Sequence, residues 1–237
     1  MIQLSASFLG TFKECMRCAW LEKNKKVRRP RGRYPSLPSG MDAAFKACYD
    51  GVRGQAACLP EELQHENLNG YLLLSDVSKI TAWRQWNAKA ALKVENPNWK
   101  LVGGFDEVLY NPASNLYIPA DFKTASSVDR TEDQAIEYHQ TQLDIYDLML
   151  LRNDFQTPGI GVIYLWAPEF LLQGKLVQFK VKTFFIETDP KRALDLCDRA
   201  AKCLVSPIMP PSGDGCEYCK YASAVHLEMP VAAAVVA

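Results

Sequence analysis

The sequence contains no run of about 18 apolar residues, the length that a membrane-spanning helix needs. Its start, MIQLSASFLGTFKEC, lacks the basic segment and long apolar stretch that mark a secretory signal peptide. We therefore expect a cytoplasmic protein. In that reducing compartment, the eight cysteines favour metal binding or buried thiols over disulfides.

The sequence also lacks an excess of charge of either sign, with 27 Lys and Arg against 27 Asp and Glu. Net charge alone thus gives no argument for a nucleic-acid partner. The charges are unevenly distributed, however, because segment 23–33, KNKKVRRPRGR, has seven basic residues and no acidic one. Such an arm predicts phosphate contacts. The candidate residues are Lys25, Lys26, Arg28, Arg29, Arg31 and Arg33.

Histidines are few, and the three present form no pattern to which we assign a role. Gly103-Gly104 lacks the Lys-Ser/Thr ending of a P-loop, which excludes that kind of phosphate site. There are no internal repeats or low-complexity segments. With 237 residues, 48% hydrophobic and 23% charged, the composition is ordinary for one globular core, alone or with an appendage.

Segment 101–124, LVGGFDEVLYNPASNLYIPADFKT, predicts two β-strands joined by a turn at 111–115. If the pairing is symmetric about that turn, Asp106 faces Asp121. Leu109, Ile118 and Phe122 point to the opposite face. We therefore expect one face of the hairpin to pack in the core and the other to carry the chemistry.

Two facing aspartates destabilise a sheet unless a cation compensates them. Their carboxylates are hard ligands that suit Mg²⁺ or Mn²⁺. Lys123 points to the same side as Asp121, and its expected cross-strand neighbour, Gly104, would leave room for a phosphate. The alternative is a solvated hairpin face with a simple Lys-Asp ion pair.

Hydrophobic spacing and capping residues predict the remaining elements. We expect helices at 5–25, from 39 to about 52, at 131–152 and at 190–204, helical structure in 81–94, and strands at 72–75, 160–166 and 175–186. In helix 131–152, Tyr138, Gln142 and Tyr146 recur every four residues and form one stripe. Trp83 and Trp86 favour core or lid packing, with base stacking as the less favoured alternative.

Two Cys-x-x-Cys pairs lie near opposite ends of the chain, Cys15 with Cys18 and Cys216 with Cys219. Four thiolates brought together would hold Zn²⁺ or an iron–sulfur cluster and would tie the two ends over the core. A redox pair and incidental cysteines are the alternatives. The other four have no such spacing and are expected to be small buried thiols: Cys48, Cys58, Cys197 and Cys203.

The order of these motifs, GGFD ending at Asp106, DFK at 121–123 and QLDIY at 142–146, resembles the PD-(D/E)XK nuclease superfamily. The resemblance is to its RecB-like branch, which includes the CRISPR-associated adaptation nucleases. It implies an α/β, restriction-endonuclease-like fold with a mixed central sheet flanked by helices. We expect a single domain at 1–228, a cysteine appendage made of 1–25 and 205–222, and a flexible tail at 229–237.

The resemblance also implies site roles. Asp106 and Asp121 would hold Mg²⁺ or Mn²⁺, Lys123 would act on the water or the developing charge, and Gln142 and Tyr146 would support the site. Many relatives have a metal-binding histidine in the preceding helix, where this chain offers Asp42 as a possible third ligand. The two symmetric cysteine pairs also depart from the relatives' arrangement, which leaves both zinc and an iron–sulfur cluster open.

We therefore expect a metal-dependent DNA nuclease, with exonuclease action favoured, serving repair, recombination or defence. Its partner would be DNA that is single-stranded or has free ends. Two alternatives stay open: a non-catalytic nucleic-acid-binding or adaptor protein on the same fold, and a protein whose cysteine centre acts in redox chemistry.

Overall fold

The computed structural model describes residues 1–30, 32, 36–55, 57–172, 174 and 176–228. Arg31, Arg33 and the tail predicted at 229–237 lie outside the described residues. The helices are α1 Ala6–Glu14, α2 Met16–Trp20, α3 Ser36–Val52, α4 Val77–Arg84, α5 Glu132–Leu151, α6 Pro190–Val205 and α7 Glu217–Glu228. The strands are β1 Ile2–Leu4, β2 Leu72–Leu73, β3 Lys93–Glu95, β4 Trp99–Val102, β5 Glu107–Asn111, β6 Leu116–Thr124, β7 Ile160–Leu172 and β8 Leu176–Glu187.

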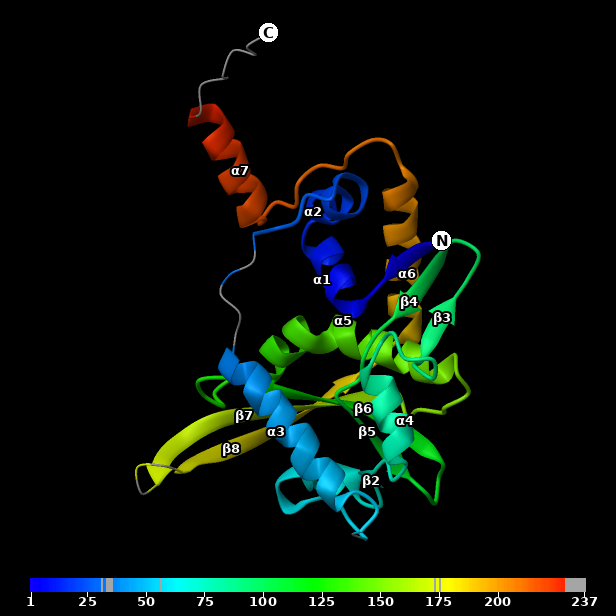
Figure 1. The fold of residues 1–237 in the computed structure, drawn as a ribbon, viewed down its shortest axis with the longest axis vertical. Helices are drawn as coiled ribbons and strands as arrows, with labels where there is room; N and C mark the ends of the chain where they lie inside the picture. Colours follow the sequence, from blue (N-terminus) through cyan, green and yellow to red (C-terminus); the bar gives the residue numbers. More distant parts are fainter. Residues whose placement is uncertain (31, 33–35, 56, 173, 175, 229–237) are drawn as a thin grey trace.

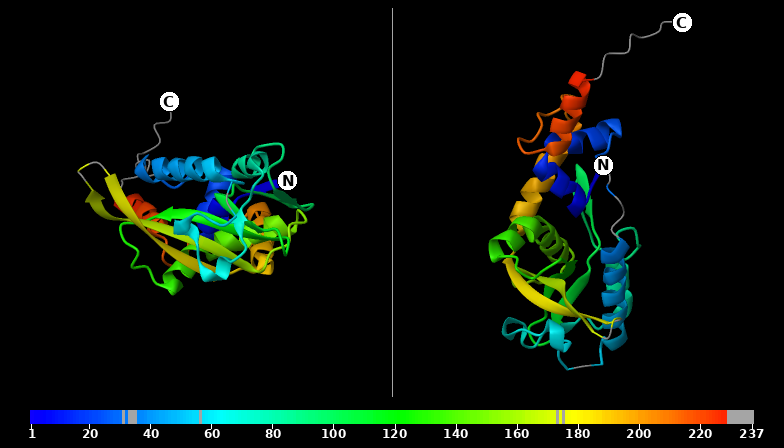
Figure 2. Two further views of the ribbon diagram at one scale, coloured as in Figure 1. Left: turned by 90° about the horizontal axis from the view of Figure 1, so that it is seen from below. Right: turned by 90° about the vertical axis from the view of Figure 1, so that its left-hand side faces the viewer.

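A five-stranded sheet in the order β2-β5-β6-β7-β8 forms the centre of the molecule (Figure 1). β6 and β7 are parallel, and the other neighbouring strands are antiparallel. A parallel pair needs a crossover connection, which α5 supplies. α5 lies on one side of the strands and α3 on the other (Figure 2). The predicted mixed sheet flanked by helices is thus confirmed.

Both faces of the β5–β6 hairpin pack against helices, and the face predicted to carry the chemistry is the one that α5 covers. On the α5 face, Val108 and Tyr117 belong to the main core together with Leu143 of α5. On the α3 face, Phe122 stacks on Tyr49 of α3, with ring centroids 5.2 Å apart. A site that a substrate can reach must therefore lie at the ends of β5 and β6, beyond the residues that α3 and α5 cover.

The hairpin of β5 and β6 has the predicted register: Glu107 pairs with Ala120 and Asn111 with Leu116. Its first strand is shorter than predicted, because 101–102 belong to β4 of a second sheet, ordered β1-β4-β3. The chain leaves the hairpin at Gly104, where a Cβ would collide with the backbone carbonyl of Arg84. The end of α4 thus fills the space on the Cβ side of Gly104, whereas the backbone of Gly104 lines a pocket on another side.

Three predicted helix boundaries were also wrong. The helix at 5–25 is capped by Ser5 as expected, but breaks at Cys15, whose φ of −156° is extended. The second helix begins at Ser36 and holds Pro38 in its first turn, where the missing N–H costs little. The helical stretch expected at 81–94 ends at Arg84, and turns lead from there to β3.

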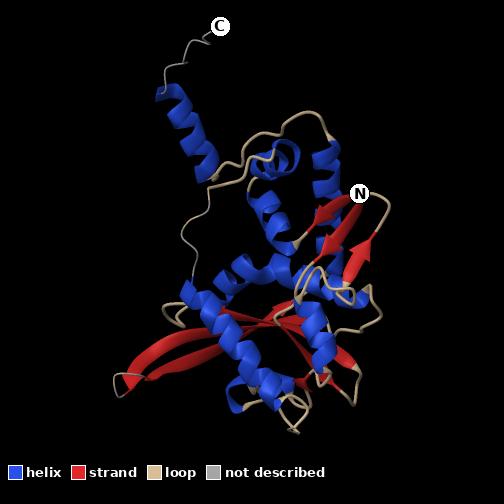
Figure 3. Ribbon diagram, in the orientation of Figure 1, coloured by secondary structure: helices blue, strands red, loops and turns tan. Residues whose placement is uncertain are grey.

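The strand at β2 and the helices α5 and α6 match the prediction. Thr131 and Gln134 close a capping box at the start of α5, and Asp189 caps α6 ahead of Pro190. Figure 3 shows how the helices surround the strands. Among the described residues, no helix combines the length and apolar character that crossing a membrane requires.

Candidate active site

Asp106 and Asp121 lie beside each other where β5 begins and β6 nears its end. Asp121 is fully buried on β6, and Asp106 occupies the bend just before β5. The two carboxyl groups are close enough for each to influence the pKa of the other. The juxtaposition inferred from the hairpin register is therefore present in the structure.

The surroundings shift the pKa values of the two carboxyl groups in opposite directions. Burial and the charge of Asp106 raise the pKa of Asp121 to about 8. Burial also acts to raise the pKa of Asp106, but the ammonium groups of Lys46 and Lys123 help to hold it below its ordinary value. The proximity of the two carboxyl groups thus favours protonation of Asp121, the more deeply buried of the two.

Two lysines supply the compensating positive charge. Lys123 of β6 makes an ion pair with Asp121. Lys46 of α3 donates to Asp106 Oδ1 at 2.8 Å and to Asp42 Oδ2 at 2.8 Å. Asp42 is therefore not brought directly against the aspartate pair, because the ammonium of Lys46 lies between Asp42 and Asp106.

The stripe on α5 joins the pair through a chain of hydrogen bonds. Gln142 Nε2 donates to Asp121 Oδ1 at 2.7 Å and contacts the Tyr146 hydroxyl at 2.8 Å. That hydroxyl donates to the Gly104 carbonyl at 2.6 Å, and the Tyr146 ring stacks on Phe105 with centroids 4.6 Å apart. Gln142 and Tyr146 thus fix the orientation of Asp121 relative to the bend that holds Asp106.

The donor set fits a hard divalent cation. Asp121 Oδ2 is buried, and it has an ion-pair neighbour in Lys123 but no hydrogen bond. Two adjacent ionised carboxylates are the ligands that Mg²⁺ and Mn²⁺ take in proteins, and binding of the cation releases any proton that they hold. Lys46 is the residue that sequence analysis missed. Its position one helical turn from Asp42 was visible in the sequence, but its reach to Asp106 depends on how α3 packs.

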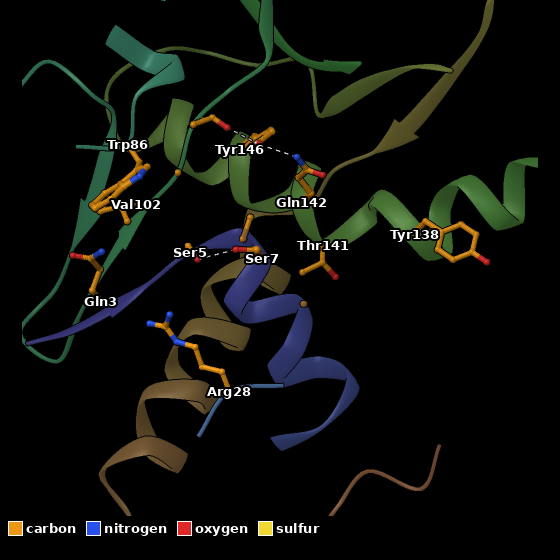
Figure 4. Close-up of a pocket in the computed structure, with 14 residues that line it drawn as sticks. Gln3, Ser5, Ser7, Arg28, Trp86, Val102, Tyr138, Thr141, Gln142 and Tyr146 are labelled. Atoms are coloured by element: carbon orange, nitrogen blue, oxygen red, sulfur yellow. Dashed lines mark hydrogen bonds between the residues drawn. The ribbon is translucent and has the colours of Figure 1, made fainter. Parts of the chain in front are cut away.

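A pocket of about 760 Å³ is lined by Gln142, the residue that contacts Asp121, but by neither aspartate. Its lining includes Gln142 and Tyr146 on α5 and reaches Tyr138, the third member of the stripe, which is exposed (Figure 4). Arg28 of the basic arm also lines it. Figure 4 draws Arg28 in front of α6, with Ser5 and Ser7 between it and Gln142.

The other described residues of the basic arm point elsewhere. Arg29 donates to Glu14 Oε2 at 2.6 Å and to Cys216 Sγ at 3.6 Å, so it faces the cysteines. Lys25 lies over the Trp20 ring, and Lys26 donates to the backbone carbonyl of Lys23. Among the predicted arm residues that the structure describes, Arg28 is the one that lines the pocket.

The four predicted cysteines come together at the far end of the molecule from β2. All four Sγ atoms of Cys15, Cys18, Cys216 and Cys219 lie within 4.8 Å of one another. Burial acts to raise the pKa of Cys15, but hydrogen bonds from the backbone of Gly213 and Cys18 lower it to about 6, which favours the thiolate. A closed thiolate site joining the two ends of the chain fits a structural metal.

The fold, the aspartate pair and the α5 stripe together define a class of metal-dependent nucleases. A model of the PD-(D/E)XK nuclease superfamily matches residues 3–224. The chain therefore belongs to the PD-(D/E)XK nuclease superfamily, whose activity is metal-dependent cleavage of nucleic acid. A comparison with curated proteins gives no match.

Proposed function

We propose that this chain is a nuclease that hydrolyses phosphodiester bonds in DNA with Mg²⁺ or Mn²⁺, and that it acts as an exonuclease. The observation that carries the proposal is the pair formed by half-buried Asp106 and buried Asp121, in which Gln142 and Lys123 contact Asp121. A protein that only bound nucleic acid would gain nothing from two carboxylates next to each other, because they repel a phosphate.

Asp106 and Asp121 would hold the divalent cation, which when bound supplies Lewis acidity for the phosphoryl oxygen and an activated water. Lys123 is placed to orient that water or to stabilise the negative charge that develops on the phosphate. Gln142 keeps the Asp121 carboxylate turned toward Asp106. Lys46 compensates Asp106 from the α3 side and separates Asp42 from the pair.

For the cysteine centre we propose Zn²⁺. The paired Sγ atoms lie 3.6 to 3.7 Å apart. Tetrahedral zinc with Zn–S bonds of about 2.3 Å requires S···S distances of about 3.8 Å. An iron–sulfur cluster is larger than a single ion, so its thiolates must stand farther apart.

The test is cleavage of end-labelled single- and double-stranded DNA, with RNA for comparison, in Mn²⁺ and in Mg²⁺. We expect metal-dependent cleavage by the wild type, no cleavage by Asp121→Asn or Lys123→Ala, and normal cleavage by the control Asp133→Asn, an exposed carboxylate on α5. A ladder that shortens from one end indicates exonuclease action. Folded, metal-loaded protein that cleaves none of the substrates would overturn the nuclease proposal.

The competing adaptor function makes a different prediction about metal binding. If the aspartate pair binds Mn²⁺, the cation raises the melting temperature of the wild type but not that of Asp121→Ala. An adaptor without a metal site gives the same melting temperature with and without Mn²⁺ in both proteins.

A further inference from the structure

Trp86 differs from the other tryptophans of this chain. Its side chain is 52% exposed, whereas Trp20, Trp83, Trp99 and Trp166 are at most 9% exposed. It lies in the turn that follows α4, in the stretch that sequence analysis expected to be helical. The core or lid packing that the sequence favoured for both Trp83 and Trp86 thus holds for Trp83 alone. Trp86 has a free aromatic face.

That face borders the pocket that Gln142 lines. Trp86 and Tyr138 lie on opposite sides of the pocket, with Gln142 and Tyr146 between them (Figure 4). The same Gln142 side chain holds Asp121 at 2.7 Å. Trp86 and Gln142 thus line the same pocket, and Gln142 connects it to Asp121; the volume of about 760 Å³ can accommodate a nucleotide.

The charge of the pocket suits a phosphodiester strand. No Asp or Glu belongs to the described residues that line it. Arg28 supplies a cation whose side chain is 67% exposed and whose ion-pair neighbour, Glu22, is 3.8 Å away. Hydroxyl groups line the pocket as well: Ser5, Ser7 and Thr141.

We propose that this pocket binds one unpaired nucleotide of a single-stranded nucleic acid next to the cleaved bond, with its base stacked on Trp86 and a phosphate at Arg28. A base can stack on a side chain only when it has left the duplex, so the pocket selects single strands or frayed ends. The inference rests on the proposed function, because it takes the aspartate pair as the place of cleavage.

The test uses tryptophan fluorescence in an Asp121→Asn background, which prevents cleavage during the measurement. Because Trp86 is the exposed tryptophan, oligothymidine or oligouridine is expected to quench the emission of this protein and to leave that of Trp86→Phe nearly unchanged. Trp86→Ala is expected to weaken single-strand binding about 10- to 100-fold, the range for loss of one stacked base. The control Phe170→Ala removes an exposed aromatic ring outside the pocket and should bind normally.

An abasic site identifies stacking directly. Moving one abasic residue along the oligonucleotide should reveal a position that weakens binding to the Trp86 protein but not to Trp86→Ala. Replacing Arg28 with Ala should reduce the salt dependence of binding by about one counterion. A Trp86→Ala protein that binds as tightly as its parent, or equal quenching by a fully paired duplex, would overturn the proposal.

The outcomes also separate this inference from the proposed function. If the wild type cleaves DNA but single strands do not quench Trp86, the nuclease function is supported and the stacking pocket is overturned. Quenching that depends on Trp86 in a protein whose wild type cleaves nothing supports the pocket and overturns the nuclease function.

Discussion

Glu107 is the most deeply buried acid outside the aspartate pair, and its partners explain why it is tolerated. It is 0% exposed and receives two hydrogen bonds from Arg53, at 3.1 and 2.7 Å. Arg53 also donates to the Leu74 carbonyl at 2.9 Å, and so ties α3 to the segment after β2. The two parallel hydrogen bonds from the Arg53 guanidinium stabilise the buried Glu107 carboxylate.

Replacing Glu107 with Gln should destabilise the fold by about 3 kcal/mol, because it leaves the guanidinium of Arg53 buried without its main counter-charge. Urea denaturation measures the change. The control Glu95→Gln breaks an exposed pair with Lys100 and should cost less than about 1 kcal/mol. Equal losses from the two substitutions would show that the Arg53 pair contributes no more than a surface ion pair.

Gln142 acts on the site through Asp121. Replacing it with Ala removes the 2.7 Å hydrogen bond that fixes the carboxylate, and we expect Mn²⁺ affinity to fall about 10- to 100-fold. Titration of Mn²⁺ against cleavage rate and against melting temperature gives two independent readouts. The matched control is Gln140→Ala, whose amide contacts Asp144 and the Glu187 carbonyl on another side of α5. A Gln142→Ala protein with unchanged Mn²⁺ affinity would contradict the positioning role.

His139 predicts a loss of stability in mild acid. Burial, with the nearby cations Lys123 and Arg130, lowers the pKa of His139 from 6.5 to about 4. Between these two pH values His139 is protonated in the unfolded chain but neutral in the folded protein. The free energy of unfolding therefore falls as the pH drops from 6.5 toward 4.

The expected contribution of His139 is up to about 3 kcal/mol, from 1.36 kcal/mol per pKa unit. His139→Gln removes this part of the slope, and urea denaturation at a series of pH values measures it. His65 is exposed, and His65→Gln should leave the slope unchanged. A slope that is the same in the wild type and His139→Gln would disprove the assignment.

At the level of single residues, the sequence predicted the parts of the site that depend on local register. Asp106, Asp121 and the α5 stripe follow from alternation along a hairpin and from helical spacing. The roles of Lys46 and Trp86 could not be read this way. The reach of Lys46 to Asp106 depends on α3 packing against the sheet, and the exposure of Trp86 depends on where α4 stops.

Among the elements, α5 packs closely on β7 at Gly161. A Cβ at Gly161 of β7 would lie 2.8 Å from Leu143 Cδ2 of α5, so this glycine lets the helix approach the sheet. Capping residues and hydrophobic spacing located both elements in the sequence. The interruption of the first helix at Cys15 was not predicted, because the geometry of the cysteine cluster decides it rather than local propensity.

Gly161→Ala should therefore destabilise the protein by about 1 to 3 kcal/mol through overpacking against α5. Gly51→Ala is the control within α3. Its added Cβ meets nothing within 4 Å, and it should stabilise the helix by about 0.5 to 1 kcal/mol. Thermal and urea unfolding measure both. If the Leu143 contact is the cause, Gly161→Ala should cost no stability when it is added to Leu143→Ala. A Gly161→Ala protein as stable as the wild type would rule out the clash.

At the scale of the whole molecule, the cysteine cluster connects the first and last parts of the chain near the pocket. Cys15 directly follows α1, whose residues Ser7 and Gly10 line the pocket. Gly213 donates its N–H to Cys15 Sγ at 3.3 Å, in a position where a Cβ would collide with the Glu14 carbonyl. Arg29 links the basic arm to Cys216. The cluster therefore orders both α1 and the arm that carries Arg28.

Removing the metal should consequently affect stability and strand binding together. We expect one Zn²⁺ per chain by elemental analysis and a colourless protein. Cys216→Ser should lose the zinc and lower the melting temperature by about 10 °C or more, because metal binding is coupled to folding of the segment that it closes. Cys48 lies outside the cluster and is exposed, as is Cys58, so the prediction that both are buried thiols was wrong. Cys48→Ser should keep both the zinc and the melting temperature. A brown protein that contains iron and sulfide would instead indicate an iron–sulfur cluster. A Cys216→Ser protein as stable as the wild type would mean that the four cysteines do not hold the two ends of the chain together.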